Sequence, residues 1–206
     1  MTQLGFFIDA AKCTGCKTCQ VACKDKNDLE VGRNFRRVTE YAGGSWEEIH
    51  GAWQQNVYAY YVSIACNHCE QPACIEACPK EAYTKRADNG LVIVDSKKCI
   101  GCHACEEACP YGAPQYNKAT RRITKCDGCI DRLAVGAQPT CVDACTQRAI
   151  EFGDISELRR RHGTLAAIAP LPDAATTKPS LVIRAPRTAK PVGDKSGSVF
   201  PLPVDD

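Results

Sequence analysis

The sequence predicts an α+β fold that is organised by its cysteines more than by a large apolar core. Cysteine accounts for 16 of the 206 residues, and these are counted within a hydrophobic fraction of only 44%. Every cysteine lies in one of four short runs, and the runs are of two repeating types. Repetition of this kind indicates an internal duplication. A chain with so few aliphatic residues needs a further source of stability.

The spacing within the runs indicates the chemistry of the cysteines. The first run reads Cys-x2-Cys-x2-Cys-x3-Cys, and the third run has the same spacing followed by proline. This pattern is typical of bacterial ferredoxins, in which three thiolates on one loop bind a 4Fe–4S cluster and the fourth binds a second cluster. We therefore predict that all 16 cysteines are cluster ligands. They are Cys13, Cys16, Cys19, Cys23, Cys66, Cys69, Cys74, Cys78, Cys99, Cys102, Cys105, Cys109, Cys126, Cys129, Cys141 and Cys145.

Two other chemistries explain these runs less well. Disulfides are common in short secreted domains, where they join distant segments, whereas the partners here lie only two or three residues apart. Zinc sites with four cysteines use two separated Cys-x2-Cys pairs, and the fourth run, Cys126 to Cys145, resembles one. The first and third runs do not, so zinc is the weaker alternative, which metal analysis would distinguish.

The two types of run predict two modules, each with one run of either type. The first and third runs share Lys-Cys-x-Gly-Cys, and the second and fourth share Gln-Pro-x-Cys-x2-Ala-Cys. The second run could pair with the third and the first with the fourth; alternatively, the first could pair with the second and the third with the fourth. Residues 79–98 form a short connection with a predicted hairpin, strands 83–86 and 91–94 around a turn at 87–90, whereas 24–65 is long. We therefore favour the first, nested pairing.

The nested pairing predicts the domain organisation and the cluster ligands. An outer ferredoxin-like module comprises 1–34 and 117–153, an aromatic insertion spans 35–65, and an inner ferredoxin-like module spans 66–116. Residues 154–206 form a short helix and an extended Pro-rich C-terminal arm. Four [4Fe–4S] clusters follow, each with three cysteines of one run and the last cysteine of its partner run. Their ligands are Cys13, Cys16, Cys19 and Cys145; Cys126, Cys129, Cys141 and Cys23; Cys66, Cys69, Cys74 and Cys109; and Cys99, Cys102, Cys105 and Cys78.

Regular structure outside the runs is predicted in two places. The β-branched and aromatic stretch 57–64 favours a strand within the insertion, which would pack over a cluster or meet a partner. A short helix is expected within 151–162, with Asp154 or Ser156 as its N-cap and Gly163 after its end. Seven of the 12 prolines lie between Pro170 and Pro203. This composition predicts a tail that is either disordered or extended along a partner subunit.

The ionisable residues near the runs are given modest roles. His68 and His103 lie inside runs and are expected to pack beside a cluster, whereas His50 and His162 are expected at the surface. The lysines that flank the runs are expected to be solvated individually and to offset cluster charge as a group. They are Lys12, Lys17, Lys24, Lys97, Lys98 and Lys125. With about −2 on each oxidised cluster, the loaded chain would carry roughly −6.

Several function classes are excluded by composition and motifs. The chain has 26 basic and 24 acidic residues, a net charge of +2, which gives no basic face for nucleic acid. It has no apolar run long enough to cross a membrane directly, and its first residues lack the pattern of a cleavable export signal. No catalytic residue is predicted, because hydrolase, metalloprotease and phosphate-loop motifs are missing. A cluster with four thiolate ligands has no open position for substrate, so electron transfer is the predicted function.

The chain resembles a known family across nearly its whole length. Besides the cysteine runs, the likeness rests on Glu40–Trp46, Gln55–Tyr61, Cys109–Tyr116 and Ala166–Pro172. On these segments the chain resembles the iron–sulfur subunits of anaerobic dimethyl sulfoxide reductases, within the four-cluster ferredoxin-like subunits of molybdopterin oxidoreductases. A free multi-cluster ferredoxin is the alternative from another class. The insertion and the tail argue against it, because a small diffusible carrier needs neither.

The resemblance implies a non-catalytic relay with four [4Fe–4S] clusters. Electrons would pass from an integral membrane, quinol-oxidising anchor subunit to a molybdopterin-containing catalytic subunit that reduces S-oxides or N-oxides such as dimethyl sulfoxide. Relatives with the same role serve polysulfide, thiosulfate, selenate or formate chemistry. In nitrate reductase relatives an aromatic residue at the position of Cys102 gives a 3Fe–4S cluster, so Cys102 implies a fourth 4Fe–4S cluster.

The resemblance also implies a location. The subunit would be peripheral and attached to the cytoplasmic membrane through the anchor subunit. It would lie on the periplasmic face if it is exported together with the catalytic subunit, and on the cytoplasmic face if it is not.

Overall fold

Short helices and strands alternate along the chain, in agreement with the predicted α+β class. The computed structural model describes residues 2–200. In chain order the elements are β1 (Leu4–Asp9), α1 (Thr18–Lys26), β2 (Arg37–Gly43), β3 (Trp46–Ile49), β4 (Ala52–Gln55), β5 (Tyr58–Ile64), α2 (Ala73–Glu76), β6 (Tyr83–Lys85), β7 (Val92–Val94), α3 (Ala104–Ala108), β8 (Gln115–Asn117), β9 (Arg122–Thr124), α4 (Ile130–Leu133), α5 (Thr140–Asp143), β10 (Ile150–Asp154), α6 (Ile155–His162), the 3-10 helix η1 (Ala174–Thr176), β11 (Leu181–Arg184) and β12 (Gly197–Phe200).

A three-stranded sheet joins the beginning of the chain to two later segments. β1 lies at its centre, antiparallel to β10 and parallel to β11. Strand β1 is buried on both faces: Phe7 packs against α6, whereas Phe6 and Ile8 belong to the main core, which also contains Cys19 and Cys145. The sheet therefore supports cysteines of the first and fourth runs.

The C-terminal segment corrects a prediction. The expected disordered tail, or arm on a partner subunit, is wrong for β11 and β12, which pair with β1 and β2 of this same chain. Leu181, Val182 and Ile183 of β11 are at most 1% exposed. Proline interrupts helices and sheets, but a single strand can still form in the segment between two prolines. The apolar residues of β11 form such a strand. The last residues of the predicted arm, 201–206, lie outside the described part.

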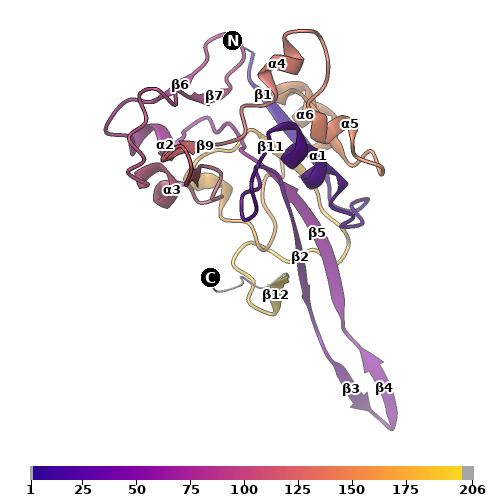
Figure 1. The fold of residues 1–206 in the computed structure, drawn as a ribbon. Helices are drawn as coiled ribbons and strands as arrows, with labels where there is room; N and C mark the ends of the chain where they lie inside the picture. Colours follow the sequence, from indigo (N-terminus) through magenta and orange to yellow (C-terminus); the bar gives the residue numbers. More distant parts are fainter. Residues whose placement is uncertain (1, 201–206) are drawn as a thin grey trace.

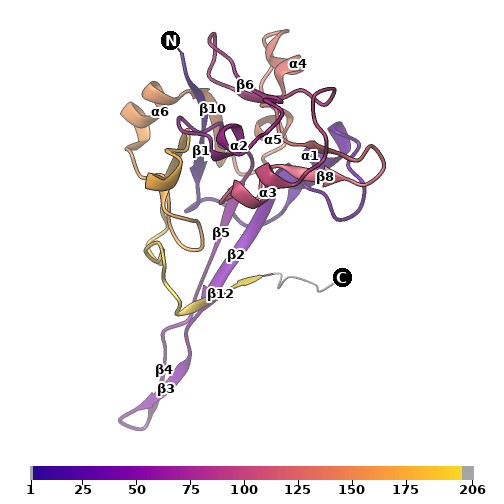
Figure 2. The same ribbon diagram turned by 90° about the vertical axis from the view of Figure 1, so that its left-hand side faces the viewer.

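The aromatic insertion forms a long hairpin. β2 and β5 pair antiparallel from Arg37↔Ile64 to Gly43↔Tyr58, and β3 and β4 continue the hairpin beyond them. Figures 1 and 2 show this tip projecting from the body of the molecule. Tyr41 and Tyr60 at the base are buried, whereas Trp46 and Trp53 at the tip are 61% and 66% exposed. The base of the hairpin therefore packs into the core, and the tip is exposed.

Two local predictions are confirmed. The expected hairpin after the second run is β6 with β7, paired from Tyr83↔Val94 to Lys85↔Val92. The expected helix is α6, whose N-cap Asp154 accepts hydrogen bonds from the amides of Ser156 (2.9 Å) and Glu157 (3.0 Å), and Gly163 follows its end. The helix begins only at Ile155, because Ile150–Asp154 pairs with β1 as a strand.

Helix packing determines which runs lie together. Helix α1, which carries the end of the first run, packs against α5 of the fourth run. Helix α2 of the second run packs against α3 of the third run. The structure thus has the spatial pairing that the shorter connection favoured. The exact domain boundaries remain a prediction.

Candidate functional site

The cysteine runs share a local backbone conformation that turns the chain sharply between the first two cysteines. Gly15, Gly101 and Gly128 occupy the same place in their runs, with φ of 70°, 70° and 78°. The second run has His68 at that place, with φ of 44°. Left-handed backbone suits glycine best, so His68 needs compensation from its surroundings. The His68 side chain is completely buried, and its Nδ1 accepts a hydrogen bond from the Val92 amide at 3.0 Å.

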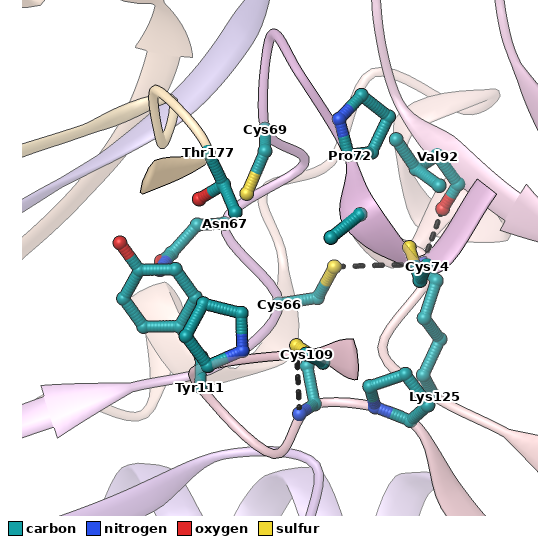
Figure 3. Close-up of a pocket in the computed structure, with 14 residues that line it drawn as sticks. Cys66, Asn67, Cys69, Pro72, Cys74, Val92, Cys109, Tyr111, Lys125 and Thr177 are labelled. Carbon is teal, nitrogen blue, oxygen red and sulfur yellow. Dashed lines mark hydrogen bonds between the residues drawn. The ribbon is translucent and has the colours of Figure 1, made fainter. Parts of the chain in front are cut away.

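The structure brings together four cysteines of the second and third runs, named here the Cys66 group. The side chains of Cys66, Cys69, Cys74 and Cys109 line one cavity. Figure 3 shows that their sulfur atoms point into the same space from different segments. The first three come from the second run, and Cys109 is the last cysteine of the third run.

Two further cavities are lined in the same way. The Cys13 group comprises Cys13, Cys16, Cys19 and Cys145, which line a second cavity. The Cys99 group comprises Cys78, Cys99, Cys102 and Cys105, which line a third cavity. In each group three cysteines come from one run and one from the run that packs against it.

The four remaining cysteines, Cys23, Cys126, Cys129 and Cys141, are named the Cys126 group and are all buried. Their sulfurs lie close enough together to raise one another's pKa values. Burial and the sulfurs of Cys141 and Cys129 raise the pKa of Cys23 to about 11. Burial and the sulfurs of Cys66, Cys23 and Cys141 raise the pKa of Cys126 well above its ordinary value. Cys23 comes from the first run, and the other three come from the fourth run.

Backbone amides point at the cysteine sulfurs. The last cysteine of the second, third and fourth runs accepts from the amide four residues later: Ala82 to Cys78 (3.4 Å), Ala113 to Cys109 (3.5 Å) and Ala149 to Cys145 (3.3 Å). Cys23 differs, because the amide group of the Asn27 side chain lies 3.7 Å from its sulfur. Hydrogen bonds of this kind stabilise a thiolate and tune the metal group that it binds.

Burial alone would keep most of these sulfurs protonated. It raises the pKa of Cys74 to about 12 and that of Cys69 to about 11. Burial also opposes ionisation of Cys66, but the neighbouring His68 and Lys125 outweigh it and lower the pKa of Cys66 to about 5. The exposed Cys16 has a pKa of about 7, chiefly because of a hydrogen bond from Thr18. Thiols that resist ionisation become ligands when a metal group displaces their protons.

The donor set fits an iron–sulfur cluster. Each group offers four thiols, three of the groups each line a shared cavity, and amides are directed at the sulfurs. Within residues 2–200, no three His, Cys, Asp or Glu side chains approach closely enough to hold a single metal ion. Four soft sulfur donors that line one cavity from two segments of the chain suit a polynuclear cluster.

Several side chains that the sequence did not single out adjoin these groups. Arg36 is buried beside the Cys13 and Cys126 groups, and Ser63 Oγ lies 3.4 Å from Cys19 Sγ. Thr177, from the C-terminal segment, lines the cavity of the Cys66 group. The pKa of Tyr83 is raised by burial and by the nearby sulfurs of Cys105, Cys74 and Cys66. These residues lie outside the cysteine runs, so the spacing within the runs carried no signal for them.

Two expectations about basic residues are wrong. Lys125, expected to be solvated, is only 5% exposed, with Nζ 3.5 Å from Cys66 Sγ (Figure 3). His162, expected at the surface, stacks on Phe7 with ring centroids 3.7 Å apart and contacts Glu151. His50 does lie in an exposed turn, and His103 packs on Tyr116 with Glu106 at 2.7 Å.

Comparison with known proteins decides the family. Residues 57–155 match the model of the 4Fe-4S dicluster domain, and residues 4–25 match that of the 4Fe-4S binding domain. The chain is 58% identical to the B subunit of the anaerobic dimethyl sulfoxide reductase of Escherichia coli (strain K12) over 196 residues, which cover 95% of both proteins. The chain belongs to the family of anaerobic dimethyl sulfoxide reductase B subunits. The predicted resemblance is thereby confirmed.

Further relatives include a second dimethyl sulfoxide reductase subunit and a formate dehydrogenase subunit. The B subunit of the anaerobic dimethyl sulfoxide reductase of Haemophilus influenzae is 52% identical over 198 residues, 96% of either protein. The iron–sulfur subunit of the nitrate-inducible formate dehydrogenase of Escherichia coli is 38% identical over 164 residues, 76% of this chain and 56% of the relative. The chain is accordingly an iron–sulfur electron-transfer subunit and not a catalytic one. No helix within residues 2–200 is long and apolar enough to span a membrane.

Proposed function

We propose that the chain relays electrons from a quinol-oxidising membrane anchor subunit to a molybdopterin-containing catalytic subunit. Membership of the family of dimethyl sulfoxide reductase B subunits favours an S-oxide or N-oxide such as dimethyl sulfoxide as the final acceptor. The observation that carries the proposal is the presence of four groups of four cysteines, each drawn from two runs. When bound, a cluster supplies a site that accepts and returns one electron, and the chain's own residues hold and insulate it.

We propose four [4Fe–4S] clusters, one in each cysteine group. The grouping of sulfurs around three similar cavities supports the ligand sets of the Cys13, Cys66 and Cys99 groups. Interactions among its four sulfurs support the Cys126 group. With four thiols in every group, no coordination position remains for a substrate, so each group suits electron transfer rather than catalysis.

The four groups form a row in the order Cys13, Cys126, Cys66 and Cys99. The sulfurs of Cys19 and Cys141 interact across the first junction, and those of Cys126 and Cys66 across the second. Tyr83, near both Cys74 and Cys105, lies at the third junction. Exposed cysteines occur only in the two terminal groups: Cys16 in one and Cys102 in the other. This order supports entry of electrons at one end and exit at the other.

The nested packing of α1 with α5 and of α2 with α3 supports two duplicated ferredoxin-like modules, with outer parts at 1–34 and 117–153 and an inner part at 66–116. Attachment to the membrane would then come from the anchor subunit. The projecting hairpin tip within 35–65 and the exposed ends of the row are the surfaces available to the two partners. We propose a peripheral position on the cytoplasmic membrane, on the periplasmic face by co-export with the catalytic partner.

Purification of the chain with its natural partners tests this function. The chain should elute with a molybdopterin subunit and a membrane subunit, and reduced quinol analogue should bleach its cluster absorption, which dimethyl sulfoxide should restore. Elution alone, with clusters intact, would indicate a free ferredoxin instead. Restoration by another oxidant but not by an S-oxide or N-oxide would assign the relay to a different molybdoenzyme. The formate dehydrogenase relative makes formate the first alternative donor to try.

A further inference from the structure

Two basic side chains are buried among the cysteine groups without a carboxylate partner. Lys125 is 5% exposed and Arg36 is 1% exposed. Within residues 2–200, neither forms an ion pair, whereas the buried Asp9 is paired with Arg184 at 2.9 Å. A buried charge without a counterion is strongly destabilising. These two cations therefore need an anionic partner from another source.

Lys125 lies at the junction of the Cys66 and Cys126 groups. Its Nζ is 3.5 Å from Cys66 Sγ and donates to the carbonyl oxygens of Val92 and Cys126, the latter at 3.0 Å. Figure 3 shows its side chain extending along the wall of the Cys66 group, with Nζ directed between Cys66 and Val92. Its backbone directly precedes Cys126, so one side chain contacts both groups.

Arg36 lies at the junction of the Cys13 and Cys126 groups. Its Nη1 donates to Ser63 O and to Ser63 Oγ, both at 3.2 Å, and its guanidinium lies 4.5 Å from the centre of the Phe6 ring. Its Nε and Nη2 are buried and have no hydrogen-bond partner. Desolvation lowers its pKa, but the sulfurs of Cys141, Cys19, Cys126 and Cys23 reverse this and raise it. Two unpartnered donors thus lie beside sulfurs of both groups.

We propose that Lys125 and Arg36 are fixed counterions that raise the reduction potentials of the clusters on either side of them. This inference rests on the clusters proposed above. Reduction makes a thiolate-ligated cluster more negative, and burial disfavours that added charge. A fixed cation in a poorly polarisable interior favours the reduced form. The cluster of the Cys126 group, which adjoins both cations, gains most. Both side chains act on electron transfer only through their charge, which keeps the clusters in the buried middle of the row reducible.

The sequence provides a matched control. Lys12, Lys98 and Lys125 each directly precede the first cysteine of a run, but Lys12 and Lys98 are exposed and Lys125 is buried.

The experiment is a redox titration of Lys125→Gln and Lys98→Gln in the intact complex, followed by paramagnetic resonance. For Lys125→Gln we expect the equilibrium constant for reduction of at least one cluster to fall about tenfold, about 59 mV for a one-electron couple. For Lys98→Gln we expect all potentials to remain those of the parent. Arg36→Gln should lower the potentials of the Cys13 and Cys126 clusters in the same way.

The outcomes distinguish an effect of the Lys125 charge from an effect of its side-chain packing. Parental potentials in a fully loaded Lys125→Gln protein, or equal shifts in Lys98→Gln, would overturn the proposal. If Lys125→Gln loses iron, Lys125→Arg decides: recovery of iron at parental potentials supports a role for the charge, and persistent loss contradicts it. Iron and sulfide are measured on the parent sample as well. A parent without clusters would refute the proposed function, whereas a loaded parent with unshifted variants would refute only this inference.

Discussion

The ends and the middle of the row of cysteine groups differ in exposure and in charge. At either end one cysteine, Cys16 or Cys102, is exposed, whereas all four cysteines of the Cys126 group are buried. Lys12 and Lys98 at the ends are exposed, and Lys125 in the middle is buried. The same short pattern, Lys-Cys, therefore has different physical roles. In the relay proposed above, this difference suits the ends to exchange of electrons with partners and the middle to stabilisation of charge away from water.

The largest expected effect is on iron content, and it differs between a cysteine ligand in the middle of the row of groups and one at an end. In Cys102→Ser, water can reach the lost ligand position, so one cluster should become a 3Fe form with a higher potential while the other clusters stay intact. In Cys129→Ser no water can replace the buried thiolate, and the iron content should fall much further. Iron analysis and paramagnetic resonance of the oxidised proteins measure both. Equal iron loss in the two variants, or an unchanged reduced spectrum in Cys102→Ser, would contradict the comparison.

The next effect concerns the backbone of an end group. A Cβ at Gly101 would lie 2.4 Å from the carbonyl oxygen of Arg121, and the position has a φ of 70°. Gly101→Ala should therefore displace Cys99 and Cys102 and release the iron of that group. Gly32→Ala is the control, because Gly32 has a φ of 91° with nothing within 4 Å of an added Cβ. It should lose only about 1–2 kcal/mol through backbone strain. Parental iron content in Gly101→Ala would show that the loop can adapt.

A smaller effect is expected at the junction beside Arg36. Ser63 Oγ lies 3.4 Å from Cys19 Sγ and accepts from Arg36. Ser63→Ala removes both interactions and should destabilise the fold by about 1 kcal/mol, as loss of a buried hydrogen bond usually does. The potential of the Cys13 cluster should fall, and those of the Cys66 and Cys99 clusters should not change. A uniform shift of all four potentials in a redox titration would argue against a local effect.

The smallest effect is a pH dependence away from the row. Desolvation opposes ionisation of Glu151, but Arg161 and His162 outweigh it and lower its pKa below the ordinary 4.5. Because the folded-state pKa is lowered, this carboxylate stabilises the fold above its unfolded pKa and loses that contribution as the pH falls through the folded value. Partly exposed pairs contribute about 1 kcal/mol or less. Hydrogen exchange of α6 should be faster in Glu151→Gln than in the parent at pH 6. The difference should vanish toward pH 3, and a difference that persists there would contradict the assignment.

The sequence predicted the parts of the site that depend on spacing. The ferredoxin pattern indicated cluster chemistry, and the short connection through residues 83–94 favoured the pairing of runs that the helix packing shows. The cap at Asp154 was also visible, because capping depends on a few neighbouring residues.

The remaining features depend on contacts between distant segments. Arg36 and Ser63 meet Cys19 only because the β2–β5 hairpin packs beside α1, and spacing along the chain cannot report that. Lys125 and Lys98 precede their cysteines identically, and only the fold buries one of them. Proline content suggested a separate tail, but pairing of β11 with β1 outweighed that local preference.

The most direct test of the central claim is the iron and acid-labile sulfide content of the oxygen-free protein, combined with its resonance spectrum after dithionite reduction. The account predicts about 16 iron and 16 sulfide ions per chain and four reducible centres whose signals broaden one another as neighbours in a row. About four zinc ions without sulfide, or a sample that remains silent after reduction, would contradict it.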